Sequence, residues 1–254
     1  MAISYQIVRA LCAAHEPGDI ILSGRSLERA QSAAADVLAE FSYTPKRVWP
    51  LRLDITDDAS IEAAFSQVQS QFGRLDALVN NAGTQLDQQQ HPGGSLTSRQ
   101  VWDQSWSVNT TSTHIVTATF VPLLLRSADA RLLFMSSGTA SLAAADNRAL
   151  FVNAVPDAGW PKMDGAAVPA YRSAKTGMNM MMKEWHRTLI NDGVKVWCVS
   201  PGYLATGLGG GVEFNRSHGA GDPALGGAFV RDVLEGKRDA DVGKVVTADG
   251  VQPW

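Results

Sequence analysis

Two kinds of hydrophobic pattern alternate along the chain. Short apolar runs rich in Val, Ile and Leu predict strands that are covered on both faces. They lie at residues 19–24, 47–54, 75–80, 131–136, 194–200 and 243–248. Between them, apolar residues recur every three or four positions, which predicts amphipathic helices. These helices are expected near residues 3–11, 27–41, 61–72, 98–125, 169–190 and 223–234.

This alternation predicts the fold class. Strands that alternate with helices form a doubly wound parallel sheet, so we expect one α/β domain over residues 1–254. The chain opens on a helix, for which Ser4 is the expected N-cap. Two long loops are predicted at residues 138–168 and 201–222. Long loops in compact domains tend to carry function.

Composition narrows the class of protein. A net charge of −3 and a pI near 5.9 give no basic footprint for nucleic acid. The most apolar stretch, residues 114–125, is too short and too polar to span a bilayer, so no membrane contact is expected. The two cysteines, Cys12 and Cys198, are both interpreted as buried and free. They favour a reducing compartment, the cytoplasm, and argue against a disulfide framework or a metal site.

The sequence "YRSAK" provides the first chemical signal. Tyr171 and Lys175 are four positions apart, so on a helix they share one face. A nearby ammonium favours the phenolate and lowers the phenol pKa from its usual value near 10. Such a tyrosine can act as a general acid in carbonyl reduction or as a base in alcohol oxidation. An isolated pair fits a solvated helix face equally well.

The pair is accompanied by polar residues at predicted strand ends, where open α/β sheets bind ligands. "FMSSGTAS" places Ser136 and Ser137 at one strand end, while "VNNAG" and "VSPGYLAT" end two others. "SVNTTST" places Asn109 in the long helical segment. Together with "YRSAK" these stretches resemble the short-chain dehydrogenase/reductase family, over residues 3–254. The resemblance implies a Rossmann-like fold and NADPH-dependent reduction of a ketone or aldehyde.

The resemblance also implies a role for each polar residue. Ser137 would bind the substrate oxygen, and Tyr171 would donate the proton. Lys175 would bind the nicotinamide ribose and tune the tyrosine, while Asn109 would hold a water molecule in the proton relay. Taken one at a time, these residues are also compatible with a buried cap, a helix asparagine and a surface lysine.

Arg25 favours NADP(H) over NAD(H) as the cofactor. It follows the strand at residues 19–24, where the family's NAD-binding members usually carry an acidic residue. Its planar guanidinium can pair with a 2′-phosphate, although an exposed loop arginine is the simpler alternative. The resemblance places the other cofactor contacts at Asp54 and Ile55 (adenine), Asn81, Ala82 and Gly83 (adenosine ribose), and Pro201, Gly202, Leu204 and Thr206 (nicotinamide and diphosphate), beside Tyr171 and Lys175.

The beginning of the chain departs from the family pattern. Members open with a strand and a turn that carries three glycines. Aligned to that turn, Ala2 falls at the second glycine and Ser4 at the third. The first strand, central between residues 19–24 and 75–80, is therefore expected to be absent, and the domain N-terminally incomplete. Three alternatives follow: a reductase whose natural chain starts earlier, a family member without cofactor binding that acts as a non-redox enzyme or binding protein, or an incomplete, inactive chain.

The spacing between Ser137 and Tyr171 bears on substrate and assembly. At 171 − 137 = 34 positions it is similar to that of monomeric carbonyl reductases, so we expect a monomer acting on a small carbonyl or alcohol. Within this insert, Leu150, Phe151 and Trp160 could line an apolar pocket or anchor the loop. The glycine-rich loop at residues 201–222 is expected to act as a lid.

Overall fold

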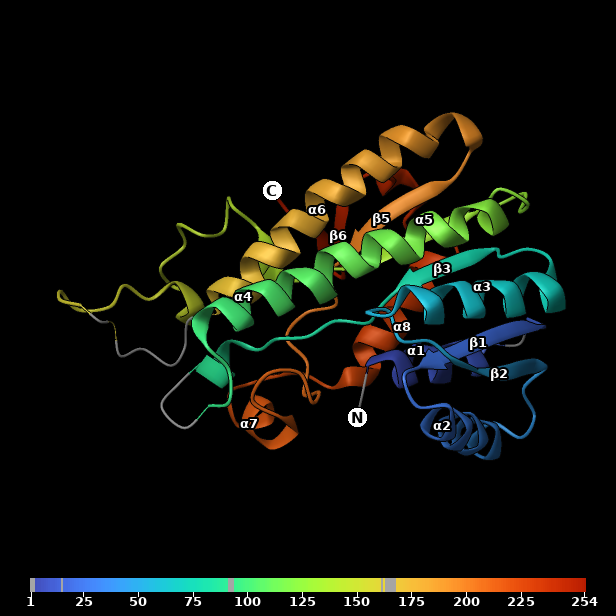
Figure 1. Cartoon of the computed structure of the whole chain (residues 1–254), viewed down its shortest axis with the longest axis horizontal. Helices are drawn as coiled ribbons and strands as arrows, with labels where there is room; N and C mark the ends of the chain where they lie inside the picture. Colours follow the sequence, from blue (N-terminus) through green and yellow to red (C-terminus); the bar gives the residue numbers. More distant parts are fainter. Residues whose placement is uncertain (1–2, 15, 91–93, 161, 163–167) are drawn as a thin grey trace.

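The computed structural model describes residues 3–14, 16–90, 94–160, 162 and 168–254, and within them the strands form two sheets (Figure 1). The small sheet pairs β1 (Gly18–Gly24) in parallel with β2 (Lys46–Arg52). The large sheet has the order β3-β4-β5-β6-β7, formed by Ala77–Asn80, Arg131–Met135, Lys195–Val199, Val245–Thr247 and Gly250–Val251. The six predicted strands are confirmed. The two-residue β7 was not predicted, and it is antiparallel to β6.

Successive residues along each strand of the large sheet point to opposite faces, and a layer of helices covers each face. On β4, Leu132 and Phe134 pack against one layer, while Leu133 and Met135 pack against the other. The first layer contains α5 (Thr113–Leu124) and α6 (Pro169–Leu189), and the second contains α1 (Ile3–Cys12) and α8 (Pro223–Leu234). The strand is buried throughout because both of its faces are covered, as its apolar sequence predicted.

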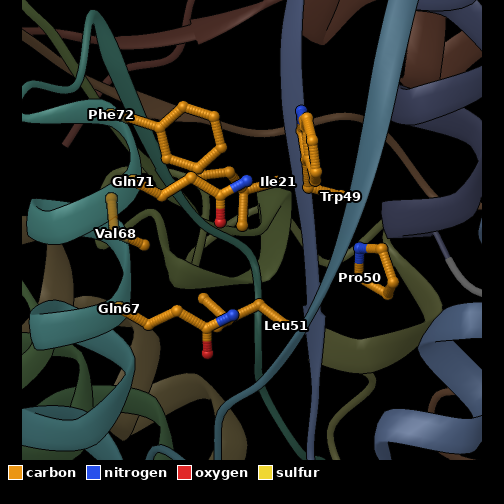
Figure 2. A pocket seen from close by; sticks show the side chains of 8 residues that line it. All are labelled: Ile21, Trp49, Pro50, Leu51, Gln67, Val68, Gln71 and Phe72. Atoms are coloured by element: carbon orange, nitrogen blue, oxygen red, sulfur yellow. The ribbon is translucent and has the colours of Figure 1, made fainter.

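Helices also cover both faces of the small sheet. Leu22 and Val48 pack with residues of α1 and of α2 (Leu27–Glu40). On the other face, Leu51 packs with α3 (Asp58–Phe72). An apolar pocket stays open between β1, β2 and α3 (Figure 2), lined by Ile21, Trp49, Pro50, Leu51, Gln67, Val68, Gln71 and Phe72. None of these eight residues belongs to the predicted site.

The two sheets are joined through helices rather than through strand pairing. Among the described residues β1 pairs only with β2, and β3 pairs only with β4. Helix α1 contacts both cores, since Ile7 packs on the large sheet and Val8 on the small one. The interruption lies where the sequence suggested an absent central strand. That a strand belongs there stays a prediction.

The long helical segment predicted at residues 98–125 is divided into three parts. An α-helix, α4 (Ser98–Trp106), is followed by a π-helical stretch, η2 (Ser107–Ser112), and then by α5. Thr97 and Gln100 form a capping box at the start of α4. The expected cap at Ser4 is wrong, because Ser4 lies inside α1. Both cysteines are buried and free, as predicted.

The segments that connect the predicted strands and helices contain short helices that the pattern did not reveal. They are η1 (Asp87–Gln90), η3 (Gly138–Ala140), η4 (Phe151–Asn153), η5 (Ile190–Asp192), α7 (Val212–Ser217) and η6 (Asp239–Asp241). Three to six residues are too few to show a helical period. In the described ranges, no helix has both the length and the apolar character that a membrane crossing needs.

Close packing of α1 on α8 gives a first prediction. A Cβ added at Gly227 would clash with the carbonyl oxygen of Gln6, which is backbone and cannot move alone. Gly227→Ala is therefore expected to lower the free energy of unfolding by about 1–3 kcal/mol. Thermal unfolding measures the loss. Gly221→Ala is the control, since a Cβ there would lie 3.7 Å from the carbonyl oxygen of Tyr203, an ordinary contact distance. Equal melting temperatures for the two variants would contradict this packing.

Candidate active site

The first turns of α6 bring Tyr171 and Lys175 together on a buried face. The helix begins at Pro169. Proline suits the first turn of a helix, because an N–H at that position would have no partner within the helix. Tyr171 is 7% exposed and Lys175 is 5% exposed. The ammonium nitrogen of Lys175 lies 5.9 Å from the centroid of the Tyr171 ring. It donates a 2.7 Å hydrogen bond to the carbonyl oxygen of Met135 at the end of β4.

The two adjacent serines after β4 have different environments. Ser136 is buried and donates to Oδ1 of Asn179 on α6, at 2.6 Å, so it ties the strand to the helix. Ser137 is half-buried, and its hydroxyl is near enough to the Tyr171 phenol to lower the pKa of that phenol. Its Oγ also accepts from the backbone N–H of Thr139 at 3.2 Å. The geometry therefore leaves Ser137, and not Ser136, beside the tyrosine.

The ionisation of this pair differs from the sequence-based expectation. Burial raises the pKa of Tyr171 to about 12, and the nearby Ser137 hydroxyl offsets only part of that effect. Burial also lowers the pKa of Lys175 to about 8. The expected lowering of the phenol pKa is wrong for this structure, because burial disfavours the charged phenolate. At neutral pH Tyr171 keeps its proton, which is the state that a proton donor requires.

Asn109 lies in the π-helical stretch η2 and is fully buried. Its Oδ1 accepts from the backbone N–H of Thr84 at 3.0 Å, and its Nδ2 donates to the carbonyl oxygen of Thr84 at 2.8 Å. These bonds fix the segment after β3 against the site. A Cβ at Gly83 would lie 2.8 Å from Asn109 Oδ1 and 3.3 Å from Lys175 Nζ. Only glycine allows the backbone to approach the site this closely.

The candidate adenosine contacts lie at the carboxyl ends of β1 and β2. Arg25 is exposed just after β1, and Asp54 follows β2. Hydrogen bonds from the N–H and hydroxyl of Thr56 hold the pKa of Asp54 below its usual range, with smaller contributions from Arg25 and Arg52. Ile55 is half-buried beside Asp54, in contact with the core between β2 and α3.

The segment after β3 fits a ribose. The Oδ1 atom of Asn81 is buried and has no hydrogen-bond partner in the described part of the chain. Buried amide oxygens without a partner are rare, and each calls for an explanation. Ala82 and Gly83 are exposed beside it. A hydroxyl group of a bound ribose would satisfy this oxygen. Ala2, the position aligned with the family's second glycine, lies outside the described residues.

The lid predicted at residues 201–222 is fixed by a residue that the sequence analysis missed. Asn215 on α7 is buried and donates to the carbonyl oxygens of Thr206 and Leu208, both at 2.9 Å. Its Oδ1 accepts from the Tyr203 hydroxyl at 3.1 Å. Pro201, Gly202 and Leu204 precede this anchor, and Gly202 has a φ of +93°, which favours glycine. A lone asparagine in a glycine-rich loop gave no signal of this role.

The insert between Ser137 and Tyr171 is anchored by Arg172. Its Nε donates to the carbonyl oxygen of Thr139 at 3.0 Å, and its Nη1 donates to that of Val152 at 3.1 Å. Leu150, Phe151 and Trp160 are 42%, 61% and 87% exposed, so none of them is buried in the core. The Phe151 ring contacts that of Tyr203, 6.5 Å between centroids, and so joins the insert to the lid.

Comparison with known proteins finds similar sequences along nearly the whole chain. Residues 2–215 match the family model described as short chain dehydrogenase. The short-chain dehydrogenase/reductase tropE of Talaromyces stipitatus is 42% identical over 257 residues, covering 99% of this chain and 94% of tropE. The short-chain dehydrogenase/reductase eupG of a Phoma species is also 42% identical, over 262 residues, with the same coverage.

Solved structures resemble the fold. NADPH-bound carbonyl reductase from chicken fatty liver superposes with a TM-score of 0.76 at 21% identity, covering 100% of this chain and 95% of the other. At that identity the likeness concerns the fold alone. It supports the arrangement of two helical layers around a parallel sheet.

Proposed function

The chain belongs to the short-chain dehydrogenase/reductase family of oxidoreductases, and on that premise we propose that it reduces a ketone or aldehyde with NADPH. One observation carries the proposal. Tyr171 is buried, the Ser137 hydroxyl is near enough to its phenol to lower the phenol pKa, and the Lys175 ammonium lies 5.9 Å from its ring centroid. Family members act on small molecules with a nicotinamide cofactor. What we propose for this chain is that the cofactor is NADPH, that the reaction is reduction, and that the residues named below carry it out.

Tyr171 and Ser137 are suited to complementary parts of the reaction. The bound cofactor would supply a hydride to the carbonyl carbon. As negative charge develops on the carbonyl oxygen, the Ser137 hydroxyl would donate a hydrogen bond to it, and such preorganised donors stabilise the transition state. Tyr171 would transfer its phenolic proton to the same oxygen. Burial of Tyr171 disfavours the phenolate that this transfer leaves behind, so the transfer depends on a nearby positive charge to compensate it.

Lys175 and Asn109 would support these two groups. The Lys175 ammonium can bind the ribose hydroxyls and compensate the phenolate that forms on Tyr171. With its pKa near 8, Lys175 keeps most of its charge at neutral pH. Asn109 holds Thr84, and we propose that it also positions the water of the proton relay. On the adenosine side, Arg25 would bind the 2′-phosphate, while Asn81 would bind the adenosine ribose.

The cofactor assignment gives a second prediction. Arg25→Ala should raise the Kd for NADPH about 10-fold or more, because a hydrogen bond to a charged partner contributes about 1.5–3 kcal/mol. The Kd for NADH should not change, since NADH lacks the 2′-phosphate. Titration with nicotinamide fluorescence as the signal measures both constants. Arg29→Ala, one turn along α2, is the control, and equal loss of both cofactors would count against Arg25 as the discriminating residue.

The whole proposal is tested by NADPH binding and by carbonyl-dependent NADPH oxidation over a panel of ketones and aldehydes. We expect a submillimolar Kd for NADPH and the reduction of at least one ketone or aldehyde in the panel. Absence of both a fluorescence change and a thermal shift at millimolar NADPH would instead favour a family member that does not bind its cofactor. The long insert and the free cysteines lead us to propose, in addition, a monomeric cytoplasmic protein.

A further inference from the structure

We propose that Asp87 is a positioning residue that holds the first turn of α6, and with it Tyr171, in place for the reaction. This inference rests on the function proposed above for Tyr171. Asp87 opens the short helix η1, in the segment that follows β3, and its side chain is buried at 6% exposure. It is a carboxylate that the proton-transfer chemistry itself does not use.

Helix α6 lacks a cap of its own. The residue at its N-cap is Val168, whose side chain has no hydrogen-bond acceptor. The first helical residue is Pro169, which has no N–H, so Ala170 and Tyr171 carry the first donors that need a partner. A helix end buried without partners for these groups would be costly.

Asp87 supplies the missing acceptors from a distant part of the chain. Its Oδ1 accepts from the backbone N–H of Ala170 at 2.9 Å, and its Oδ2 accepts from that of Tyr171 at 3.2 Å. Both oxygens of one carboxylate thus bind consecutive amides at the positive end of the helix dipole. Negative charge is favourable at that end. The second bond is made to the residue proposed as the proton donor.

The position of Asp87 distinguishes it from the other helix caps. Asp57 on α3 and Asp222 on α8 are local caps, since each accepts from an N–H two residues further along the chain. Asp87 instead caps a helix 83 positions later. Its own segment is tied to the site, because Asn109 holds Thr84 through two hydrogen bonds. Asp87 therefore couples the position of Tyr171 to the segment that carries Asn81 and Gly83.

The consequence for the reaction is geometric. Proton transfer requires the phenol oxygen within hydrogen-bond distance of the reacting oxygen, and a displacement of about 1 Å can lower the rate about 100-fold. Loss of the Asp87 bonds would leave the first turn of α6 with two unpaired buried amides. We expect that turn to loosen, and the tyrosine to lose its fixed direction.

The test compares Asp87→Ala, which removes both acceptors, with Asp87→Asn, which keeps one. Asp57→Ala is the matched control, because it removes a local aspartate cap on α3. In both Asp87 variants kcat should fall, by about 10- to 100-fold in Asp87→Ala, while the Kd for NADPH and the KM for the carbonyl stay within about twofold. A merely structural change, as in Asp57→Ala, should lower the melting temperature without this selective loss of kcat.

Hydrogen exchange gives a readout that does not depend on turnover. Amide exchange at Ala170 and Tyr171 should accelerate at least about 10-fold in Asp87→Ala, and less in Asp87→Asn, with no change there in Asp57→Ala. Unchanged exchange at these two amides would overturn the proposal, and so would accelerated exchange with unchanged kcat. If the parent chain reduces no carbonyl, the proposed function fails, and the exchange rates still decide whether Asp87 holds Tyr171. Should Asp87→Ala not fold, Asp87→Asn carries the test.

Discussion

Replacing Tyr171 with Phe is expected to lower kcat/KM for carbonyl reduction by about 10³-fold or more. The substitution removes only the phenolic hydroxyl and keeps the ring that fills this buried position, 7% exposed. General acid catalysis typically contributes about 10²–10⁴-fold, and the variant has no proton to give at this position. The Kd for NADPH should stay within a few-fold, since Lys175 and Arg25 are untouched.

The matched control for this variant is Tyr203→Phe. Tyr203 is 44% exposed on the lid, and its hydroxyl binds Asn215, so its loss should change turnover only modestly. Steady-state NADPH oxidation by both variants, together with circular dichroism and thermal unfolding, separates lost chemistry from lost folding. Substantial turnover by a folded Tyr171→Phe protein would remove Tyr171 from the proposed role.

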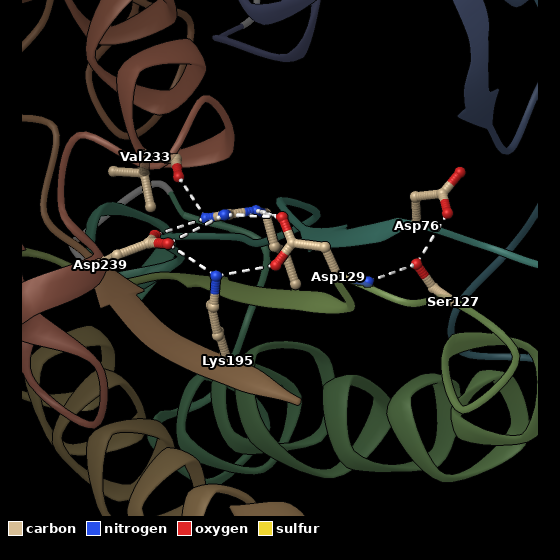
Figure 3. A network of polar contacts seen from close by, with 7 residues as sticks. Asp76, Ser127, Asp129, Lys195, Val233 and Asp239 are labelled. Carbon is tan, nitrogen blue, oxygen red and sulfur yellow. Dashed lines mark hydrogen bonds and ion pairs between the residues drawn. The ribbon is translucent and has the colours of Figure 1, made fainter. Parts of the chain in front are cut away.

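The second large effect concerns stability. It involves the amino-terminal ends of β4 and β5, at the end of the large sheet opposite the site. Arg131 is buried at the start of β4, and its guanidinium donates to Asp239 at 2.7 Å, to Asp129 at 2.9 Å and to the carbonyl oxygen of Val233 at 3.1 Å. Lys195 on β5 bridges the two carboxylates, at 2.8 and 2.7 Å (Figure 3). The network joins β4 and β5 to the segment after α8.

Replacing Asp239 with Ala removes the main partner of a buried guanidinium. Breaking a buried ion pair on one side costs about 3–5 kcal/mol. Because Asp239 is 34% exposed and Asp129 remains, we expect a smaller loss of about 2 kcal/mol. For a chain of this size that lowers the melting temperature by about 4–8 °C. Asp19→Ala, which breaks the exposed pair with Arg47, should cost less than about 1 kcal/mol. Equal losses would show that burial of Arg131 does not matter.

The same network predicts a pH dependence. The hydrogen bond from Arg131 lowers the pKa of Asp239 to about 2, from an ordinary value of 3.8. Between these values the unfolded chain binds the proton more tightly than the folded chain does, so stability falls as the pH falls. The contribution should be fully present above about pH 4 and lost as the pH approaches about 2. Denaturant unfolding at several pH values should show a smaller acid-induced loss in Asp239→Ala than in the parent chain.

The elements that could be predicted are those with a regular period. The six strands lie at the predicted apolar runs. A strand that is covered on both faces needs apolar residues at nearly every position, and such a run is easy to recognise. Helices α2, α3, α6 and α8 follow their stripes in the same way. Helix α7 and strand β7 were missed, since six helical residues and two strand residues are too few for a hydrophobic period to repeat clearly. The π-helical stretch was missed because its six mostly polar residues carry no signal that separates a π-helical turn from the α-helices on either side.

The sequence by itself determined which chemical groups are available: Ser137, Tyr171 and Lys175, in an order and spacing typical of one family. Tertiary structure decided how those groups behave. Burial raises the pKa of Tyr171 where the local Tyr–Lys spacing had suggested a lower value. Asp87 caps a helix 83 positions away, which no local pattern can reveal. Spacing along the chain fixes contacts within one helix, whereas desolvation and distant hydrogen bonds depend on which segments the fold brings together.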